Sequence, residues 1–580
     1  GDAFASLVVG AVDNGSLQVH NVNKYGAKQL AFSLHAGDTW KVTSRLTVNY
    51  GLRWDKFTPT YETGDLLTFF SFAPNPGAGN LPGSVAYAGN KFGAASAGVR
   101  YPETPFNGGF GPRVGAAYRL DNQTVLRAGY GVFYTQAFYP GWGGGMSLDG
   151  FNPQLSFGSS ISGYEPSFYL DKGFPSYSTA PNISQSADNG TNGPNYRPTY
   201  ANHLSYTQQW NMTVERKIGN SSIVSVAYIG NKGTHLPSQM QPLNVLNPAL
   251  LTSLGSTKLN TVFQSGQTSL FGVSVPYSNW VQTLNDGGTC KPTVAQALVA
   301  YPQFCGGLTG ENENQGTSIY QSFQAKLEKG FQNGLYAGAS YTWSRLTTSA
   351  SSTTQATAGY GGIGSVINPF QGSRNKALSP DDIPNTVSIL ATYDLPLGAG
   401  KKWMNGTGFT NHLFGGWTLA TSMKFTSGMP FYFRDSTVCG VPGQFQAQCI
   451  PAITGTVLTQ SWGSFDVNKP AYNAAAFEPI SSFANGNNLG TGPRVSSVRG
   501  SPYRDTNISL AKKFTFKERL HMEIRAEAFN VLNNHYFTCD GQAFGDCTPF
   551  NNDPSSPNFG TWNGTVSQPR NIQLVGRITF

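Results

Sequence analysis

The sequence predicts an all-β protein, an antiparallel transmembrane β-barrel. Three observations favour this fold class. Apolar and polar residues alternate over many segments of about 8 to 14 residues, as expected of strands with two different faces. The connections between these segments are alternately very short and very long. Charged residues make up 12% of the chain and aromatic residues 13%, and this charged share is about half of the usual one.

The composition fits strands that cross a membrane better than helices that do. Mean hydropathy is −0.27, and no stretch approaches the roughly 18 apolar residues that a membrane helix needs. In a barrel, apolar residues that face lipid alternate with polar residues that face the lumen. Each strand is then apolar at only half of its positions, which explains the modest average.

The clearest alternation runs from Leu520 to Ala528, where even positions are apolar and odd positions are polar or charged. On a helix these charges would lie all around the cylinder, whereas on a strand they share one face. A soluble β-sandwich also contains such strands, so the prediction depends on repetition. About 13 segments repeat the pattern, near residues 28–41, 45–58, 109–120, 124–136, 203–218, 222–234, 317–330, 333–346, 382–396, 413–428, 504–517, 520–534 and 570–580.

The predicted connections form two classes that alternate along the chain. One connection, 397–412, belongs with the short ones by position, yet it is long and contains Lys401 and Lys402. Short periplasmic turns and long external loops are typical of outer-membrane barrels. Phe580 at the end of the last strand is interpreted as the signal for barrel insertion. Turns near 42–44, 121–123, 219–221, 332–334 and 517–519 alternate with excursions near 59–108, 137–202, 235–316, 347–381, 429–503 and 535–569.

Charge and cysteine usage restrict the partners and the compartment. The net charge is +8, but Lys and Arg are scattered, so nucleic acid is not an expected partner. The excess positive charge suits contact with acidic lipopolysaccharide and outer-membrane lipid.

Six cysteines form three local couples, which favours disulfides in an oxidising compartment over free thiols. No spacing or histidine cluster favours zinc. The disulfide candidates are Cys290 with Cys305, Cys439 with Cys449, and Cys539 with Cys547.

Candidate functional residues lie on one strand face and in the long loops. No catalytic constellation is found, so we expect neither an enzyme nor a cofactor or metal. Lumen-facing charges are predicted at Glu523, Arg525, Glu527 and Arg577, with Lys512 and Lys513 as their pairing partners. This set is either a structural ladder of charges across strands or a polar wall that contacts solute. Aromatic side chains in the long loops either stack on a ligand or pack the loops against one another. They are Phe138, Tyr139, Trp142, Trp280, Tyr301 and Trp462.

Four segments resemble a known family in the family's own order. Residues 42–55 read VTSRLTVNYGLRWD and resemble a strand common in TonB-dependent receptors. Residues 209–216 (QWNMTVER), 226–235 (VAYIGNKGTH) and 525–533 (RAEAFNVLN) are similar to segments of the Oar-like members of that family. The similarity covers nearly all predicted strands and fades in the long loops.

The resemblance implies a barrel of about 22 strands that encloses a plug. It also implies an N-terminal regulatory-like domain and a segment that contacts the TonB–ExbB–ExbD complex. On this interpretation residues 1–580 are the C-terminal part of the barrel, and the first strands, the plug and the regulatory-like domain are absent from this chain. The start of the chain has no leader features, and we expect Gly1 to lie inside a longer precursor.

The resemblance further implies a receptor in the bacterial outer membrane for TonB-energised uptake or export of a large solute, such as a siderophore, glycan or peptide. The barrel-assembly machinery is the implied partner of the C-terminal strand. Two alternatives stay open, namely a passive porin or adhesin barrel and a secreted, disulfide-bonded all-β binding protein. An outer-membrane enzyme is a weaker third alternative, because it needs a triad that the sequence does not display.

Overall fold

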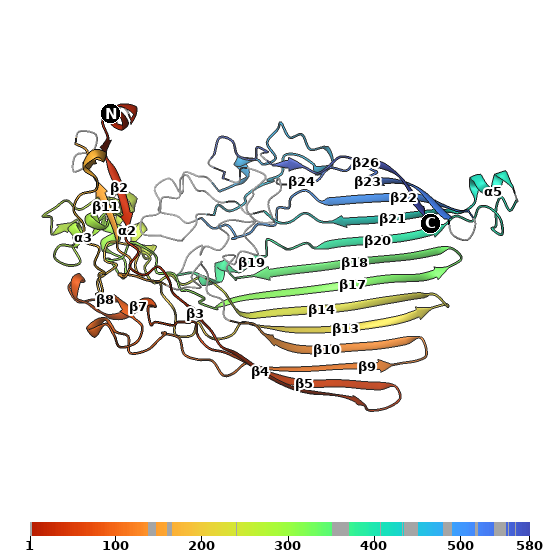
Figure 1. Ribbon diagram of the computed structural model, residues 1–580, viewed down its shortest axis with the longest axis horizontal. Coiled ribbons are helices and arrows are strands. Elements are labelled where there is room, and N and C mark those ends of the chain that lie inside the picture. The colour runs from red at the N-terminus through yellow and green to blue at the C-terminus, as the bar shows by residue number, and fades with distance from the viewer. Residues whose placement is uncertain are drawn as a thin grey trace.

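The computed structural model describes residues 3–136, 147–158, 165–238, 240–350, 370–406, 408–431, 433, 450–478, 490–516, 520–538, 551, 553–554, 556–562 and 564–580. Figure 1 shows that they form one broad, curved sheet. Short connections lie at one end of its strands and long excursions at the other. We name these the turn end and the long-loop end.

Fourteen strands of the described residues form this antiparallel sheet, and β19 (Ala377–Leu378) pairs only with one end of β18. The other strands follow one another in chain order, each antiparallel to the next. This confirms the predicted all-β class and the predicted set of strands within a few residues. These strands are β4 (Ala31–Lys41), β5 (Leu46–Phe57), β9 (Phe110–Arg119), β10 (Thr124–Tyr134), β13 (Tyr206–Ile218), β14 (Ser222–Leu236), β17 (Gly316–Gln332), β18 (Leu335–Thr348), β20 (Asn385–Asp394), β21 (Trp417–Thr426), β22 (Tyr503–Phe516), β23 (Leu520–Phe529) and β26 (Asn571–Thr579).

The register places the alternating residues on two different faces. Met212 pairs with Tyr228, Tyr228 with Phe323, and Phe323 with Trp343, so the four apolar side chains lie on one face across four strands. All four are exposed, from 42% for Phe323 to 59% for Trp343. A soluble sandwich would bury such a face against a second sheet. The apolar face instead lies uncovered, as a surface that meets lipid does.

Tight turns join neighbouring strands at the turn end. Gln332 of β17 pairs with Leu335 of β18, so only Asn333 and Gly334 connect them. Both have positive φ, 53° and 80°, and Asn-Gly suits such a hairpin because these residues tolerate left-handed backbone. The predicted turn 517–519 lies outside the described residues. The connection from β20 to β21 also lies at the turn end, yet it contains the helix α5 (Phe409–Phe414).

The long excursions fold into lobes with small elements of their own. Residues 245–305, which we name the disulfide lobe, contain three helices around Trp280 and Leu284. The short helices were not predicted from the sequence, and all of them lie outside the sheet. The remaining elements are α1 (Ala3–Val8), α2 (Ala249–Leu259), α3 (Trp280–Gly287), α4 (Val294–Ala297), β1 (Ala11–Val12), β2 (Asn14–Gln18), β3 (Ala27–Lys28), β6 (Tyr61–Glu62), β7 (Thr68–Asn75), β8 (Leu81–Tyr87), β11 (Gln154–Gly158), β12 (Phe168–Tyr169), β15 (Ser269–Leu270), β16 (Val273–Ser274), β24 (Phe537–Thr538) and β25 (Thr565–Val566).

The sheet is open, with β4 and β26 at its two edges. Each edge strand pairs with a single neighbour among the described residues, and every residue of both strands is exposed. Phe580 follows β26 at the turn end, where Figure 1 marks the C-terminus. Over the part of the chain that the structure describes, every helix is too short or too polar to span a bilayer.

Candidate functional site

The predicted lumen-facing charges lie together on the face opposite the apolar one. Arg525 Nη2 lies 2.5 Å from Glu523 Oε1, and Arg525 Nη1 donates a hydrogen bond of 3.0 Å to Glu527 Oε1. Arg577 of β26 pairs in register with Glu523, and Gln573 donates to Glu527. We name this set the charge ladder. Because solvent reaches these side chains and screens their charges, the ion pairs add little to stability, so water-facing polarity is the main property of the charge ladder.

One expected partner of the charge ladder was assigned to the wrong face. Lys513 pairs with Glu523 in register and shares its face. Lys512 pairs with Ile524 and Trp417, on the apolar face, and is 3% exposed. Its Nζ donates to two backbone carbonyls at the end of α5, those of Leu413 and Gly415. The error follows from strand geometry, since consecutive residues point to opposite faces.

A cavity of about 360 Å³ opens where the polar face reaches the long-loop end. Phe529 lies on the ladder's face, two residues beyond Glu527, and pairs with Asn571. The rings of Tyr503 and Tyr536 meet edge to face, with centroids 5.5 Å apart. We name this space the rim cavity. It is lined by Tyr503, Arg504, Asp505, Asn507, Phe529, Asn530, Asn534, Tyr536, Ser567, Gln568, Pro569 and Asn571.

Hydrogen bonds hold the amides of the rim cavity in place. Asn507 Nδ2 donates to Asp505 Oδ2 at 2.7 Å, while Asn507 Oδ1 accepts from the backbone of Asn530 at 2.9 Å. Asn530 in turn donates to the carbonyls of Asn534 and Gln568, at 2.8 and 3.3 Å. Fixed amides beside aromatic rings suit a solute that has both flat faces and hydroxyl or amide groups.

Sequence reasoning did not find the rim cavity. Its rings and amides come from the start of β22, the end of β23, the start of β26 and two connecting segments, which are far apart in the chain. Two groups of polar and aromatic residues in the sequence could have indicated it. They are residues 503–507 and 529–536, each at the end of a predicted strand. Their proximity follows only from the pairing of β22 with β23.

The predicted loop rings occupy different environments. Trp280 is fully buried in the disulfide lobe, and its Nε1 donates to the carbonyl of Pro302 at 2.9 Å. A ring in this position packs the loop and offers no surface to a solute. Tyr301 is partly buried, with its ring centroid 5.1 Å from that of Phe70. Phe138, Tyr139 and Trp142 lie outside the described residues.

Trp462 belongs to a second group of rings at the long-loop end. Its ring centroid is 5.2 Å from that of Phe465, which lies 4.6 Å from Phe537 of β24, and Phe537 lies 5.6 Å from Trp562. All four side chains are partly buried. Tyr536 of the rim cavity directly precedes Phe537, so this ring group adjoins the cavity along the chain.

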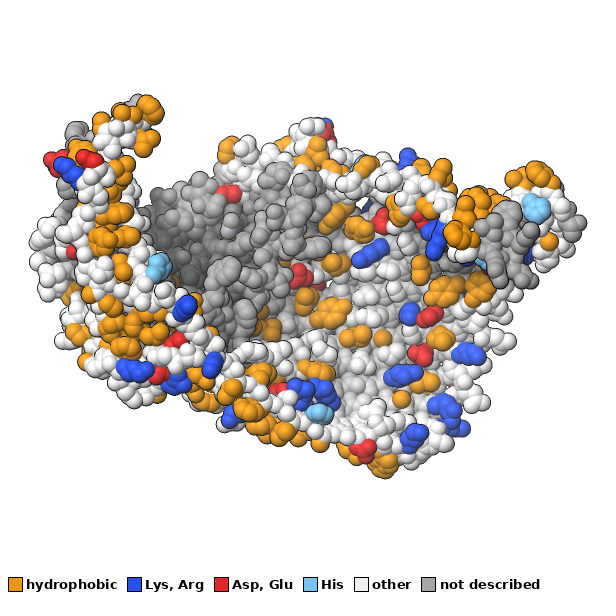
Figure 2. Space-filling view, in the orientation of Figure 1, with side chains coloured by type: hydrophobic (Ala, Val, Ile, Leu, Met, Phe, Trp, Pro, Cys, Tyr) orange, Lys and Arg blue, Asp and Glu red, His pale blue; other side chains and the backbone are white. Residues whose placement is uncertain are grey.

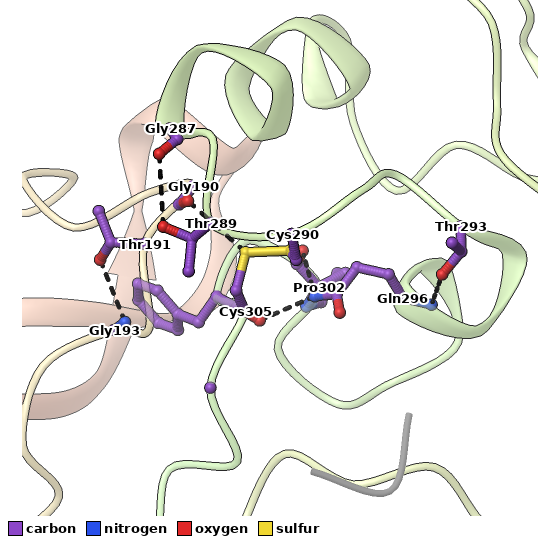
Figure 3. Close-up of a disulfide and its surroundings, with 12 residues drawn as sticks. Gly190, Thr191, Gly193, Gly287, Thr289, Cys290, Thr293, Gln296, Pro302 and Cys305 are labelled. Carbon is purple, nitrogen blue, oxygen red and sulfur yellow. Dashed lines mark hydrogen bonds between the residues drawn. A yellow bond between two sulfur atoms is a disulfide. The ribbon is translucent and has the colours of Figure 1, made fainter. Parts of the chain in front are cut away.

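Cys290 and Cys305 form a disulfide that closes the disulfide lobe, with Cα atoms 5.6 Å apart (Figure 3). Gln296 of α4 reaches across the same site and donates to the carbonyls of Pro302 and Phe304, at 3.1 and 2.8 Å. The cysteines at 439, 449, 539 and 547 lie outside the described residues. Among the residues that are described, no cluster of three or more His, Cys, Asp or Glu side chains is placed to hold a metal ion.

Buried charged side chains connect different excursions at the long-loop end. The side chains of Arg197 and Glu103 are fully buried, and Arg197 Nε donates to Glu103 Oε1 at 2.7 Å. Burial raises the pKa of Glu311 to about 7, although the charge of Arg197 opposes this shift. Burial also raises the pKa of Glu313 to about 7, although the backbone N–H groups of residues 240, 241 and 310 donate to it.

An exposed apolar face, a polar face with a charge ladder, and segregated turns and loops define a membrane-spanning β-barrel wall. The chain belongs to the family described as "Outer membrane beta barrel domain", whose model matches residues 1–573. It is therefore an outer-membrane protein, as predicted. No curated protein matches this sequence.

Solved structures with a similar arrangement include outer-membrane receptors and transporters. The ferric-catecholate import receptor Fiu from E. coli K12 has 9% identity and a TM-score of 0.36, covering 96% of this chain and 45% of its own. The ferripyoverdine receptor of Pseudomonas aeruginosa has 10% identity and a TM-score of 0.37, covering 96% and 39%. The transporter YddB from Escherichia coli has 10% identity and a TM-score of 0.36, covering 96% and 54%. The chain thus spans about half the length of these proteins or less.

Proposed function

We propose that this chain forms external loops and part of the barrel wall of a TonB-energised receptor that moves a large solute across the outer membrane. The observation that carries the proposal is the rim cavity, which opens at the long-loop end of the polar face, beside the charge ladder. A solute held there lies at the start of a water-facing surface that runs toward the turn end. The four segments that resemble TonB-dependent receptors, three of them Oar-like, support energy coupling.

The lining of the rim cavity indicates how it recognises solute. Tyr503 and Tyr536 offer ring surfaces, while Asn507 and Asn571 offer amides that donate and accept. Arg504 and Asp505 supply one charge of each sign. This combination suits neutral or weakly charged solutes with hydroxyl and amide groups, such as a glycan, a peptide or the organic part of a siderophore. The proposal involves no covalent step and no bound cofactor.

An uptake experiment tests energy coupling. The full-length protein is expressed in cells that have no other uptake route for the probes. The probes are radiolabelled ferric citrate, a fluorescent oligosaccharide and a labelled peptide. Uptake of the transported probe is then compared before and after a protonophore dissipates the proton-motive force across the inner membrane. We expect uptake to stop after this treatment. Uptake that continues unchanged would instead establish the passive porin, and surface binding without uptake would establish the adhesin.

A binding experiment tests the rim cavity itself. Tyr536→Ala removes one of its rings. We expect the affinity for the transported probe to fall about fivefold, because stacking on one ring contributes about 1 kcal/mol to binding. Tyr25→Ala is the matched control, because Tyr25 is also at the long-loop end and is 47% exposed. Isothermal titration with the purified protein in detergent measures both affinities. Equal affinities of the two variants would remove the rim cavity from the proposal.

A further inference from the structure

The connection between β20 and β21 differs from the other connections at the turn end. Residues 395–416 include α5 and project beyond the strand ends, at the far right of Figure 1. Most of its large apolar side chains are exposed, from 38% for Phe414 to 55% for Trp403 and 80% for Phe409. Figure 2 shows hydrophobic side chains gathered at this tip. We name residues 395–416 the α5 projection.

Two side chains fix the α5 projection to the apolar face of the sheet. Trp417 and Lys512 pair in register on that face. Trp417 Nε1 donates to the carbonyl of Leu413 at 3.0 Å, and Lys512 Nζ donates to the same carbonyl at 3.1 Å and to that of Gly415 at 2.7 Å. The last carbonyls of α5 therefore receive their hydrogen bonds from groups on the lipid-facing side. The apolar residues of the projection continue the surface that meets lipid.

The charges of the α5 projection are all positive. Residues 395–416 contain Lys401 and Lys402, both exposed, and no Asp or Glu. The ammonium group of Lys402 lies 5.4 Å from the ring centroid of Trp403. A tryptophan ring beside lysines is typical of the boundary between hydrocarbon and head groups, where the ring enters the interface and the ammonium groups reach phosphate.

We propose that the α5 projection is an interfacial anchor that binds anionic phospholipid head groups of the leaflet at the turn end. Phe409, Leu413 and Trp403 enter the edge of the hydrocarbon, while Lys401 and Lys402 contact the phosphates. Two features favour lipid as the occupant, namely continuity with the apolar face and the purely positive charge. The anchor fixes the height of this part of the wall in the membrane, whatever solute the barrel transports.

Hydrogen exchange in nanodiscs of defined lipid tests this proposal. The full-length protein is placed in nanodiscs of phosphatidylcholine alone or with phosphatidylglycerol, and exchange of peptide 397–416 is measured by mass spectrometry. We expect phosphatidylglycerol to slow exchange in this peptide. We also expect K401Q/K402Q to abolish the difference, and to lower the affinity for phosphatidylglycerol by about fivefold for each lysine.

Two further variants separate the anchor from a general effect of charge or folding. K258Q/K291Q removes two exposed lysines from the disulfide lobe, and Lys258 also lies beside an aromatic ring, that of Phe271. This control is expected to keep the difference between the two lipids. F409S/L413S is expected to speed exchange of peptide 397–416 in both lipids, while peptides of the strands keep their protection.

Two results would overturn the proposal. The first is equal exchange of peptide 397–416 in nanodiscs with and without phosphatidylglycerol. The second is protection that appears only when soluble periplasmic protein is added, because the occupant would then be a protein. Uptake of the transported probe by K401Q/K402Q is measured in parallel and is expected to remain, so failure of the anchor is distinguishable from failure of the transport function.

Discussion

The two ends of the sheet obtain their structure in different ways. At the turn end, Asn333 and Gly334 suffice to connect two strands, and their backbone conformation sets the pairing. At the long-loop end, buried side chains from different excursions pack together, a disulfide closes one lobe, and a fully buried ion pair joins Arg197 to Glu103. The comparison teaches that local backbone preference governs one end, while side-chain packing within and between the excursions governs the other.

If side-chain packing at the long-loop end is separate from the pairing of the strands, damage to the core of the disulfide lobe should stay at that end. Trp280→Ala empties the centre of the disulfide lobe, where the ring is fully buried. We expect the lobe to lose about 3 to 5 kcal/mol of local stability, with exchange of peptides 249–305 greatly accelerated and exchange of the strands unchanged. Hydrogen exchange of the protein in detergent measures both.

The matched control is Trp343→Ala, since Trp343 is 59% exposed on the apolar face of the sheet. It is expected to leave the disulfide lobe unchanged. Equal acceleration in the strands and in the lobe after Trp280→Ala would show that the two regions unfold together, and the proposed independence would fail.

The second test uses pH, because the long-loop end buries carboxyl groups. Burial raises the pKa of Glu311 to about 7 in the folded protein, from an ordinary value of 4.5. The folded form binds the proton more tightly, so this contribution to stability is full below pH 4.5 and is lost as pH rises through 7. The shift corresponds to about 3 kcal/mol.

We therefore expect the lobes of the wild-type protein to open more readily at pH 8 than at pH 5.5, after correction for intrinsic exchange. Glu311→Gln is expected to reduce this pH dependence by about half, because Glu313 has a similarly raised pKa and remains. Peptides around 333–334 at the turn end serve as the internal control. An unchanged pH dependence in the variant would contradict the assignment of the effect to Glu311.

The smallest expected effect lies at the turn end. Gly334 has a φ of 80°, and a Cβ added there would lie 2.9 Å from the carbonyl oxygen of Asp394. Gly334→Val is expected to cost about 1 to 2 kcal/mol and to lower the denaturant midpoint of the sheet without opening the lobes. Gly338→Val on β18 is the control, because a Cβ there meets nothing within 4 Å. Equal midpoints for the two variants would contradict the role given to the turn.

The strands were predictable because each one carries its own information. Alternation from Leu520 to Ala528 defines two faces without knowledge of any neighbour, and the register confirms both. The alternation of short and long connections was predictable for the same reason, because residue types such as Asn333 and Gly334 indicate a tight turn in the sequence. The outer-membrane class follows from these two patterns together.

The lobes and the rim cavity were not predictable, because they depend on contacts between distant residues. Trp280 was a ligand candidate from its loop position, and only the packing of α2 to α4 reveals it as a core residue. Tyr503 and Tyr536 meet through strand pairing that no local pattern specifies. Lys512 was placed on the wrong face because its neighbour Lys513 has the same charge and points the other way.

The long connection that contains the disulfide lobe leaves the sheet after Leu236 of β14 and returns at Gly316 of β17, and these two residues pair. Its entry and exit points are therefore about one strand spacing apart, roughly 5 Å. A connection with such closely spaced ends can change in length without changing the pairing of the strands below. The geometry of this single connection thus lets the loop vary while the membrane-spanning strands keep their register.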